Sequence, residues 1–190
     1  DPASLVLPML RQNEGAVRLG YAVYLLYSIL FFPVARVLSR TAMGAASAAL
    51  TTATGFAAMS TLARSIGIVR WLSAMPLLAA AYADPATSEA TRASIDLLYR
   101  ALNAFGGTIG EALGVSLFAA LWLALTSAHA LRAATWPRWL SVSGLIAAVV
   151  LALPLLELSG IDLGPIVSIS TTAIQLWLMA AGVWLLRRGR

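Results

Sequence analysis

The stretch LNAFGGTIGEALGVSLFAALW, residues 102–122, decides the fold of this chain. It is long and apolar enough to cross a bilayer as one helix, which takes about 20 predominantly apolar residues. Yet a carboxylate, Glu111, lies near its middle. A charged side chain at the centre of a bilayer costs at least about 2.5 kcal/mol. We therefore expect Glu111 to face the interior of a helix bundle, to be paired, or to be protonated.

The composition of the whole chain is that of a membrane protein. Of its 190 residues, 60% are hydrophobic and 11% are charged, and the mean hydropathy is +0.84. Soluble domains carry about 25% charged residues, and so short a chain could not bury this much apolar surface in water. The apolar runs are continuous and do not alternate, which argues against a membrane β-barrel. The sequence predicts an all-α, polytopic transmembrane helix bundle.

Five apolar segments divide a single integral membrane domain over residues 1–190. The second and third are too long for one crossing of a hydrocarbon core about 30 Å thick. Between them ADPATSEATR, residues 83–92, has the residues of a turn. We therefore expect a long helical hairpin that protrudes from the membrane; a six-span alternative places a turn near residues 65–67. The expected spans are residues 18–38, 43–66 with an extension to 83, 100–127, 139–158 and 166–186.

Arginines set the expected orientation, because all 13 basic residues are Arg and cytoplasmic loops are enriched in basic residues. In the five-span arrangement most of them gather beside the C-terminus, which predicts a bacterial inner-membrane protein with a cytoplasmic C-terminus. The six-span alternative also satisfies this rule, with both ends of the chain inside. Trp136 and Trp139 are expected to be interfacial anchors. The chain does not begin with Met, and we expect a further span upstream.

A polar and glycine-rich column runs along the helix that contains the quoted stretch. At about 100° per residue its members share one helix face. Gly106, Gly110 and Gly114 form small-xxx-small steps, which let membrane helices pack closely. Asp96 and Arg100 have the i,i+4 spacing of a surface ion pair. The column consists of Asp96, Tyr99, Arg100, Asn103, Gly106, Gly107, Gly110, Glu111 and Gly114.

Other polar side chains are expected at a depth similar to that of Glu111. Gln175 lies about two turns into the fifth span, and Arg64 ends the second span on the same side. Hydroxyl side chains within residues 168–172 line the start of the fifth span, and Glu157 lies nearer the surface. The sequence therefore predicts a polar pocket in the outer half of the bundle. It consists of Glu111, Asn103, Gln175 and Arg64, with Asp96 and Arg100 at its mouth.

Glu111 has three interpretations. It locks helices together, through hydrogen bonds that average about 0.6 kcal/mol in membrane bundles. It belongs to a pocket that binds a ligand or handles protons. Or it forms a catalytic pair with Glu157, although the expected depths of the two carboxylates argue against direct contact. Arg64 and Arg70 would either bind anionic lipid headgroups or anchor the helix by snorkelling.

Several function classes lack a pattern in the sequence. There is no Cys, and His129 is the single His, which excludes thiolate and His-rich metal sites. GGTIGEALG, residues 106–114, lacks the Lys and the preceding strand of a phosphate-binding loop. The arginines are scattered near helix ends, unlike a nucleic-acid-binding patch. We expect no metal, no cofactor and no nucleic-acid partner.

The sequence favours a non-enzymatic membrane protein, in contact with membrane lipids, whose polar intramembrane pocket binds a small amphipathic or lipid-like ligand or protons. The alternative is a structural or assembly subunit. Its glycine face would dock a partner helix of the same chain, of a homo-oligomer or of a partner membrane subunit. An intramembrane enzyme is the least favoured hypothesis.

Five stretches resemble a family of bacterial multi-pass membrane proteins known as domain of unknown function 4386. They are RLGYAVYLLYSILFFPVA (18–35), GIVRWLSAMPLLAAAYADPATS (67–88), the stretch quoted above, PRWLSVSGLIA (137–147) and LWLMAAGVWLLRR (176–188). The strongest markers are Arg70-Trp71 with Pro76, Asn103 with the glycines and Glu111, and Pro137-Arg138-Trp139. The resemblance implies the membrane fold, with one more span upstream, and implies no activity.

Overall fold

The computed structural model describes residues 2–44, 47–161, 163–164 and 166–188. Within these residues the regular secondary structure is entirely helical, and short turns join the helices. One segment, η1, is a π-helix and another, η2, is a 3₁₀-helix. In chain order the elements are α1 (Ala3–Gln12), α2 (Glu14–Met43), α3 (Ala48–Leu72), α4 (Ala74–Ala83), α5 (Glu89–Gly107), η1 (Thr108–Ala119), α6 (Ala120–Arg132), α7 (Arg138–Ala152), η2 (Leu153–Ser159) and α8 (Ile166–Arg188).

Five helical runs in the described part of the chain are long and apolar enough, by length and composition, to cross a membrane. This confirms the predicted all-α bundle with five such helices. The runs are Glu14–Met43, Ala48–Ala83, Glu89–Arg132, Arg138–Ser159 and Ser168–Arg188.

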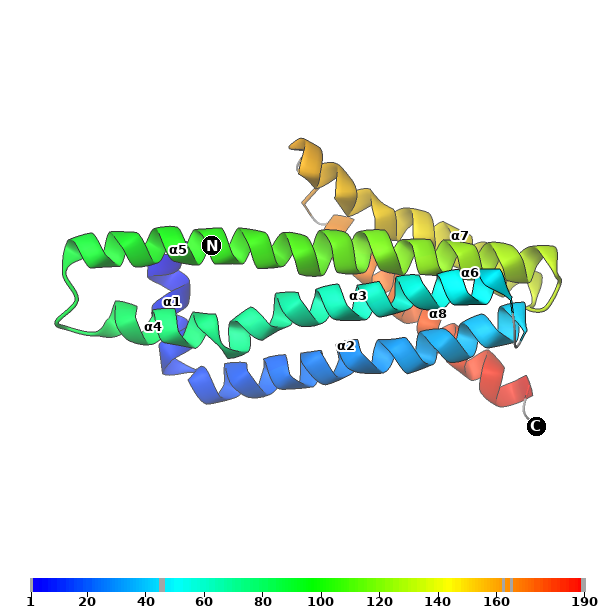
Figure 1. The fold of residues 1–190 in the computed structure, drawn as a ribbon, viewed down its shortest axis with the longest axis horizontal. Helices are drawn as coiled ribbons and strands as arrows, with labels where there is room; N and C mark the ends of the chain where they lie inside the picture. Colours follow the sequence, from blue (N-terminus) through cyan, green and yellow to red (C-terminus); the bar gives the residue numbers. More distant parts are fainter. Residues whose placement is uncertain (1, 45–46, 162, 165, 189–190) are drawn as a thin grey trace.

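The second and third runs form a long antiparallel hairpin (Figure 1). They contain 36 and 44 residues, which is far more than the roughly 20 residues that cross a hydrocarbon core. The α4–α5 end accordingly extends well beyond α2, α7 and α8 (Figure 1). At its tip the N–H of Ala86 donates to Asp84 Oδ1 at 2.8 Å. Ser88 Oγ accepts from the N–H of Thr91 at 3.2 Å and so caps α5.

The six-span alternative is wrong, because α3 is continuous from Ala48 to Leu72. The break falls at Ser73, where the backbone leaves the helical conformation with φ −121° and ψ −72°. Pro76 follows in the first turn of α4. It has no N–H to continue the helical ladder from α3, which explains a break at this place.

A short helix, α1, lies across the hairpin rather than along it (Figure 1). Its buried face carries Ala3, Leu7 and Leu10, spaced as one side of an amphipathic helix. These residues form a second apolar core with Met75 of α4 and Tyr99 of α5, apart from the main core of the bundle. Helix α1 therefore holds the two arms of the hairpin together near its protruding end.

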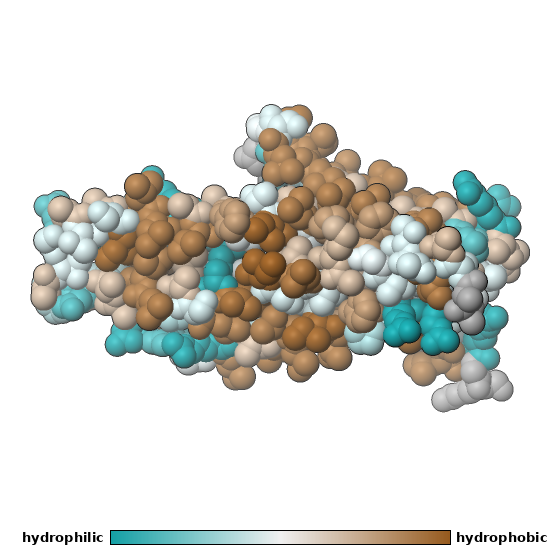
Figure 2. All heavy atoms as spheres, viewed as in Figure 1, coloured by the Kyte–Doolittle hydropathy of each residue, from teal (hydrophilic) through white to brown (hydrophobic). Residues whose placement is uncertain are grey.

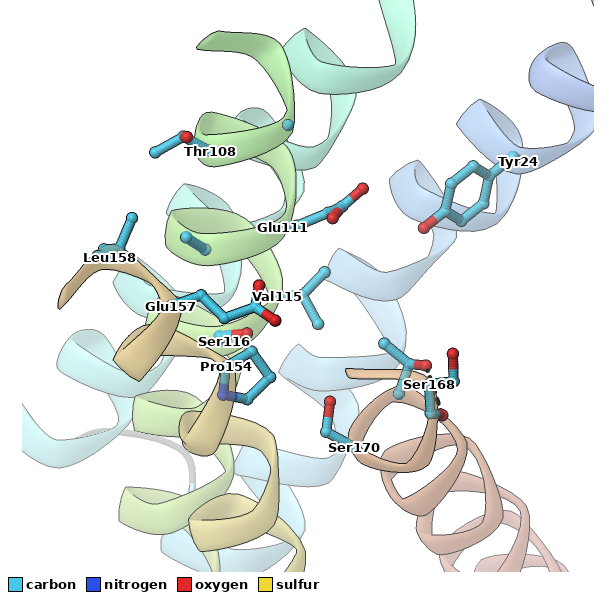
Figure 3. Close-up of a pocket in the computed structure, with 13 residues that line it drawn as sticks. Tyr24, Thr108, Glu111, Val115, Ser116, Pro154, Glu157, Leu158, Ser168 and Ser170 are labelled. Carbon is cyan, nitrogen blue, oxygen red and sulfur yellow. Dashed lines mark hydrogen bonds between the residues drawn. The ribbon is translucent and has the colours of Figure 1, made fainter. Parts of the chain in front are cut away.

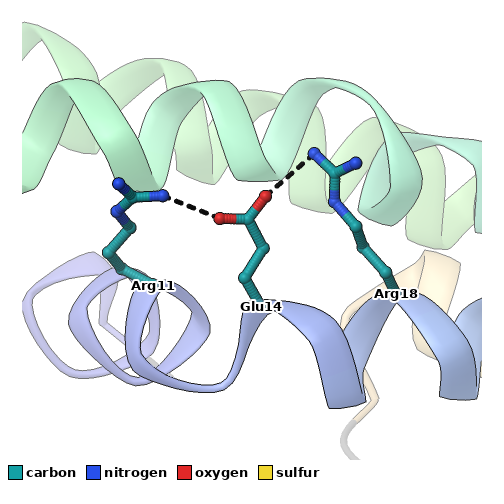
Figure 4. Close-up of polar contacts among 3 residues, drawn as sticks. All are labelled: Arg11, Glu14 and Arg18. Carbon is teal, nitrogen blue, oxygen red and sulfur yellow. Dashed lines mark hydrogen bonds and ion pairs between the residues drawn. The ribbon is translucent and has the colours of Figure 1, made fainter.

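Two ion pairs meet at Glu14 beside the junction of α1 and α2, one with Arg11 of α1 and one with Arg18 within α2 (Figure 4). Glu14 accepts from Arg11 at 2.7 Å and from Arg18 at 2.9 Å. Both arginines are about half exposed, so each pair contributes no more than about 1 kcal/mol. The pairs bias the geometry of the bend rather than carry its stability.

An aromatic column fills the main core. The rings of Phe31 and Trp122 meet edge to face at 5.1 Å between centroids, and Trp122 meets Trp177 at 6.2 Å. Trp122 is fully buried, and its Nε1–H donates to Ser39 Oγ at 2.9 Å. The Ser39 hydroxyl in turn donates to the carbonyl oxygen of Ala35 at 2.9 Å. This chain of hydrogen bonds joins α2 to α6.

The two tryptophans that were expected at the membrane surface differ in position. Trp139 is exposed, as an interfacial anchor would be. Trp136 is only 4% exposed, and its Nε1–H donates to Thr41 Oγ1 at 3.0 Å. The interfacial prediction is therefore wrong for Trp136, because its ring packs on Trp177 inside the bundle.

The surface is apolar over most of its length. Figure 2 shows hydrophobic side chains along the middle of the molecule, with hydrophilic side chains gathered mainly towards its ends. Large apolar side chains such as Leu30, Val149 and Met179 are 51%, 67% and 61% exposed. In water this surface would be unfavourable, whereas in a bilayer it faces lipid.

Candidate functional site

The site is built on the close packing of α3 against η1. A methyl group added to Gly67 would lie 2.8 Å from the Cα of Gly110, so the two backbones touch. One added to Gly114 would lie 2.8 Å from Cγ of Arg64, and one added to Gly106 would collide with Arg70. The glycines that the sequence predicted to be packing residues thus lie against α3 of the same chain. They leave room for two arginine side chains between the helices.

The π-helical backbone of η1 presents Glu111 beside this glycine face. A π-helix bonds each N–H to the carbonyl five residues earlier, and such segments often occur at functional sites. The buried hydroxyl of Ser60 donates to the carbonyl oxygen of Gly114 at 2.7 Å and ties η1 to α3. Glu111 follows directly after Gly110 in η1. Its side chain is exposed in the structure, so of the three alternatives expected for it, burial in the bundle interior is not observed.

Glu111 lines a cavity of about 390 Å³ between η1, η2 and α8 (Figure 3). Glu157 of η2 lines the same cavity, and both carboxylates extend into it (Figure 3). Neither forms an ion pair or hydrogen bond with any residue that the structure describes. Hydroxyl groups complete the polar wall. The lining residues that bear them are Tyr24, Thr108, Ser116, Ser168, Ser170 and Thr171.

A second cavity, of about 100 Å³, adjoins the first and is basic. Arg64 and Arg70 of α3 line it, and Tyr24 and Glu111 belong to both cavities. Arg70 and Glu111 line this cavity together, and the two side chains form no ion pair. The site therefore has an acidic chamber and a basic chamber, with Glu111 between them.

Arg64 is the most unusual group of the site. It is only 7% exposed, and its Nε–H has no hydrogen-bond acceptor among the described residues. Its guanidinium group lies over the rings of Tyr27 and Phe31, at 5.1 and 5.3 Å from their centroids. A buried guanidinium without an anionic partner is destabilising unless something pairs with it. An anionic group of a ligand would supply the missing partner.

An apolar groove continues the basic chamber along the bundle. Arg64 and Gln175 line a small cavity of about 30 Å³, and Gln175 also lines the start of a groove of about 410 Å³ between α2 and α8. A further 430 Å³ of groove follows beside Val37 and Leu186. The groove exists because α2 packs on α3 and α6 while α8 packs on α7 and η2. Helices α2 and α8 therefore stand apart.

The cavity lies about one hydrocarbon thickness from the arginine-rich end of the molecule. Helices α2, α6 and α8 finish at that end and α7 begins there (Figure 1). Counting about 20 residues, or about 30 Å, back along α6–η1, α7–η2 and α8 reaches Glu111, Glu157 and Ser168. These three residues thus lie at a similar distance from the arginine-rich end of the molecule. The arginines are Arg36, Arg40, Arg132, Arg138, Arg187 and Arg188.

Three of the predicted pocket residues lie outside the cavities. Asn103 accepts a hydrogen bond from Arg70 Nη2 through its Oδ1 at 3.3 Å, so it positions that arginine. Asp96 and Arg100 pair with each other on the surface of α5. The structure thus brings together Glu111, Arg64 and Gln175 around neighbouring cavities. It places Asn103, Asp96 and Arg100 on α5, outside these cavities.

Sequence reasoning missed three contributors. Gly67 was assigned to a possible turn, although its spacing from Arg64 and Arg70 places it on the same helix face. Tyr24 was not assigned to the predicted pocket, but it lines both cavities. Glu157 was not expected to contact Glu111 directly and was left out of the predicted pocket, but it lines the same cavity as Glu111 because η2 packs beside η1. No group of three or more His, Cys, Asp or Glu side chains in the described residues could hold a metal ion.

Comparison with known proteins identifies a family but no activity. The family model described as Domain of unknown function (DUF4386) matches residues 1–189. No curated protein and no solved structure gives a significant match. The chain belongs to the DUF4386 family.

Proposed function

We propose that this DUF4386 protein is a non-enzymatic protein of the bacterial inner membrane that binds an amphipathic, lipid-like ligand. The observation that carries the proposal is a row of neighbouring cavities that share lining residues. Beside the chamber with two carboxylates lies a small cavity at Arg64 and Gln175, and beside that cavity lies an apolar groove between α2 and α8. An amphipathic molecule has the same division into a polar and an apolar end.

The depth of the cavities supports a ligand that resides in the bilayer. The acidic chamber falls at the level of a membrane surface, where lipid headgroups lie, and the groove extends from there into the hydrocarbon. Exposed apolar side chains such as Leu30, Val34 and Met179 form the walls of the groove. A ligand would enter sideways from the lipid, with its polar end in the chamber and its tail in the groove.

The two competing functions use other features. A subunit that docks a partner through Gly106, Gly110 and Gly114 needs that face to be free, but α3 of the same chain covers it. A proton-handling role would use Glu111 and Glu157 without the groove. The groove therefore favours the amphipathic ligand over both alternatives.

The arginines support an orientation. The positive-inside rule places the arginine-rich end in the cytoplasm, and with it the C-terminus. The acidic chamber and the protruding α4–α5 hairpin would then face the opposite, periplasmic side.

Blocking the groove tests this function. Val34→Trp places a bulky ring in the groove, while Val149→Trp, at an exposed position of α7, serves as the matched control. The purified, delipidated protein in dodecyl maltoside is titrated with lysophospholipids, and its thermal unfolding midpoint is recorded. We expect single-chain lipids to raise the midpoint of the wild type and of Val149→Trp but not of Val34→Trp. If Val34→Trp responds like the wild type, the groove is not the tail site and the proposal fails.

A further inference from the structure

We propose that the polar end of the ligand is a zwitterion, with an anionic phosphate at Arg64 and a primary ammonium group between Glu111 and Glu157. A phospholipid of the ethanolamine class has this chemistry. The inference rests on the proposed function, since it names the class of ligand for the same site.

The charges of the site are balanced but not paired. Arg64 and Arg70 face Glu111 and Glu157 across adjoining chambers. The ion pairs of the described chain involve none of these four residues. Arg64 is buried, and a buried charge is costly unless it is paired. Glu111 and Glu157 are exposed and have no ion-pair partner among the described residues. A ligand that carries one charge of each sign would pair both ends of the site without changing its net charge.

The basic chamber suits a phosphate group. Arg64 is buried, its Nε–H lacks an acceptor, and aromatic rings hold its guanidinium plane on Tyr27 and Phe31. A guanidinium held in this way presents a preorganised fork of N–H donors, which matches the oxygens of a phosphate. Arg70, whose Nε–H is also without an acceptor, is fixed by Asn103 and adds a second positive charge.

The acidic chamber suits a primary ammonium group. Such a group has three N–H donors and no acceptor, so it needs three acceptor oxygens. Glu111 and Glu157 supply carboxylate oxygens, and Tyr24, Thr108 and Ser168 supply hydroxyl oxygens around them. A quaternary ammonium group could not donate hydrogen bonds to these oxygens. The chamber therefore favours ethanolamine over choline.

The order of the chambers matches the order of groups in a phospholipid. The apolar groove joins the small cavity of Arg64 and Gln175, since Tyr27, Phe31 and Gln175 line both. Tyr24 and Arg64 connect that cavity to the basic chamber, and Glu111 connects the basic chamber to the acidic one. A ligand that follows this path meets hydrocarbon first, then the arginine, then the carboxylates. In a phospholipid the tail, the phosphate and the ammonium group follow in the same order.

Binding of four probes to the delipidated full chain tests the inference. The probes are lysophosphatidylethanolamine, lysophosphatidylcholine, lysophosphatidylglycerol and the water-soluble O-phosphoethanolamine, each titrated in dodecyl maltoside against the unfolding midpoint. We expect lysophosphatidylethanolamine to bind about tenfold more tightly than the glycerol and choline lipids, because only it donates charged hydrogen bonds to the carboxylates. O-Phosphoethanolamine should bind much more weakly, because it has no tail for the groove.

Variants locate the two ends of the ligand. In Glu111→Gln and Glu157→Gln the preference for ethanolamine over glycerol should fall from about tenfold towards onefold, while binding of the glycerol lipid persists. Arg64→Met keeps the aliphatic stem but removes the charge, and it should weaken both lipids. Arg64→Lys, which keeps a positive charge, should restore part of the affinity. Glu89→Gln at the hairpin tip and Arg132→Met at the arginine-rich end are the matched controls.

The outcomes separate the two proposals. If lysophosphatidylethanolamine and lysophosphatidylglycerol bind wild type equally, or if the preference survives both glutamate variants, the zwitterion inference is overturned while amphipathic binding stands. If O-phosphoethanolamine binds as tightly as its lipid, the ligand is a free zwitterion and the lipid assignment fails. If no probe binds, the proposed function fails as well.

Discussion

Gly67 of α3 and Gly110 of η1 are in backbone contact: a methyl group at Gly67 would lie 2.8 Å from the Cα of Gly110. The second atom it would meet, also at 2.8 Å, is the carbonyl oxygen of Gly106. Neither neighbour is a side chain that could turn away. We expect Gly67→Ala to lower the free energy of unfolding by about 1–3 kcal/mol, as overpacking does, measured as a lower thermal unfolding midpoint.

Gly55 provides the control in the same helix. A methyl group there meets nothing within 4 Å, and Ala is a better helix former than Gly by about 1 kcal/mol. Gly55→Ala should therefore keep or raise the midpoint. Equal effects of the two substitutions would contradict the close contact between α3 and η1.

The hydrogen bond from Trp122 to Ser39 connects α6 to α2 in the fully buried core. Ser39→Ala leaves the indole N–H of Trp122 without its acceptor. Leaving a buried donor unsatisfied costs about 1–3 kcal/mol, and we expect a loss of stability in that range, read from the unfolding midpoint. Ser143→Ala removes only a local bond to the carbonyl oxygen of Leu140 and should change the midpoint much less. If Ser39→Ala leaves the unfolding midpoint unchanged, the hydrogen bond contributes nothing to stability.

Glu111 should be dispensable for folding. Its side chain is exposed and, among the described residues, forms no ion pair or hydrogen bond. Surface substitutions of this kind usually change stability by less than about 0.5 kcal/mol, so Glu111→Gln should unfold at nearly the wild-type midpoint in the absence of lipid. A large loss of stability would favour the interpretation of Glu111 as a structural lock and would count against a ligand site.

The packing of α1 against the hairpin should depend on Leu7. This side chain is fully buried against the hairpin, whereas Leu5 on the other face is 65% exposed. Leu→Ala substitutions in a packed core cost about 2–5 kcal/mol. We expect Leu7→Ala to release α1 from α4 and α5 and to make the N-terminal segment sensitive to protease, while Leu5→Ala stays resistant. Equal resistance would mean that α1 is held by other contacts.

The absence of cysteine makes the orientation directly measurable. Ala86 is exposed at the tip of the hairpin, and Ala133 is exposed after α6 at the arginine-rich end. In intact cells a membrane-impermeant maleimide should label Ala86→Cys on the periplasmic side. Ala133→Cys should react only after the cells are permeabilised. The reverse pattern would invert the proposed orientation.

The helical fold could be predicted from the sequence, and so could three of the residues that line the cavities, Glu111, Arg64 and Gln175. Continuous apolar runs predicted the helices, and the four-residue spacing of Gly106, Gly110 and Gly114 predicted a tight helix contact. Both signals lie within short stretches of sequence, so they can be recognised without knowing which helices pack together in the fold. The prediction of a turn at residues 65–67 was wrong because glycine occurs both in turns and at close helix contacts. The contact of Gly67 with Gly110 distinguishes the two cases, and it cannot be recognised from the sequence around Gly67.

The rest of the site depends on relations between distant elements. Asn103 shares a helix face with Glu111 at α-helical spacing. Its side chain accepts a hydrogen bond from Arg70 of α3 and does not line the cavities. Glu157 joins Glu111 because η2, which continues the helical run of α7, packs beside η1, so that both carboxylates line one cavity (Figure 3). Packing between elements that are distant in the sequence leaves no periodicity, so residue counts along separate helices give the two carboxylates a similar depth but do not predict that they share a cavity.

The separation of α2 from α8 has a consequence for how occupancy of the site is controlled. A groove that opens sideways equilibrates with the surrounding leaflet and not with the aqueous phase. Its filling therefore follows the mole fraction of a ligand among the lipids, whatever the total amount of membrane in the cell. Under the proposed function, a sparingly soluble ligand would saturate such a site as soon as it became a sufficient share of its leaflet, and the protein would then respond to membrane composition.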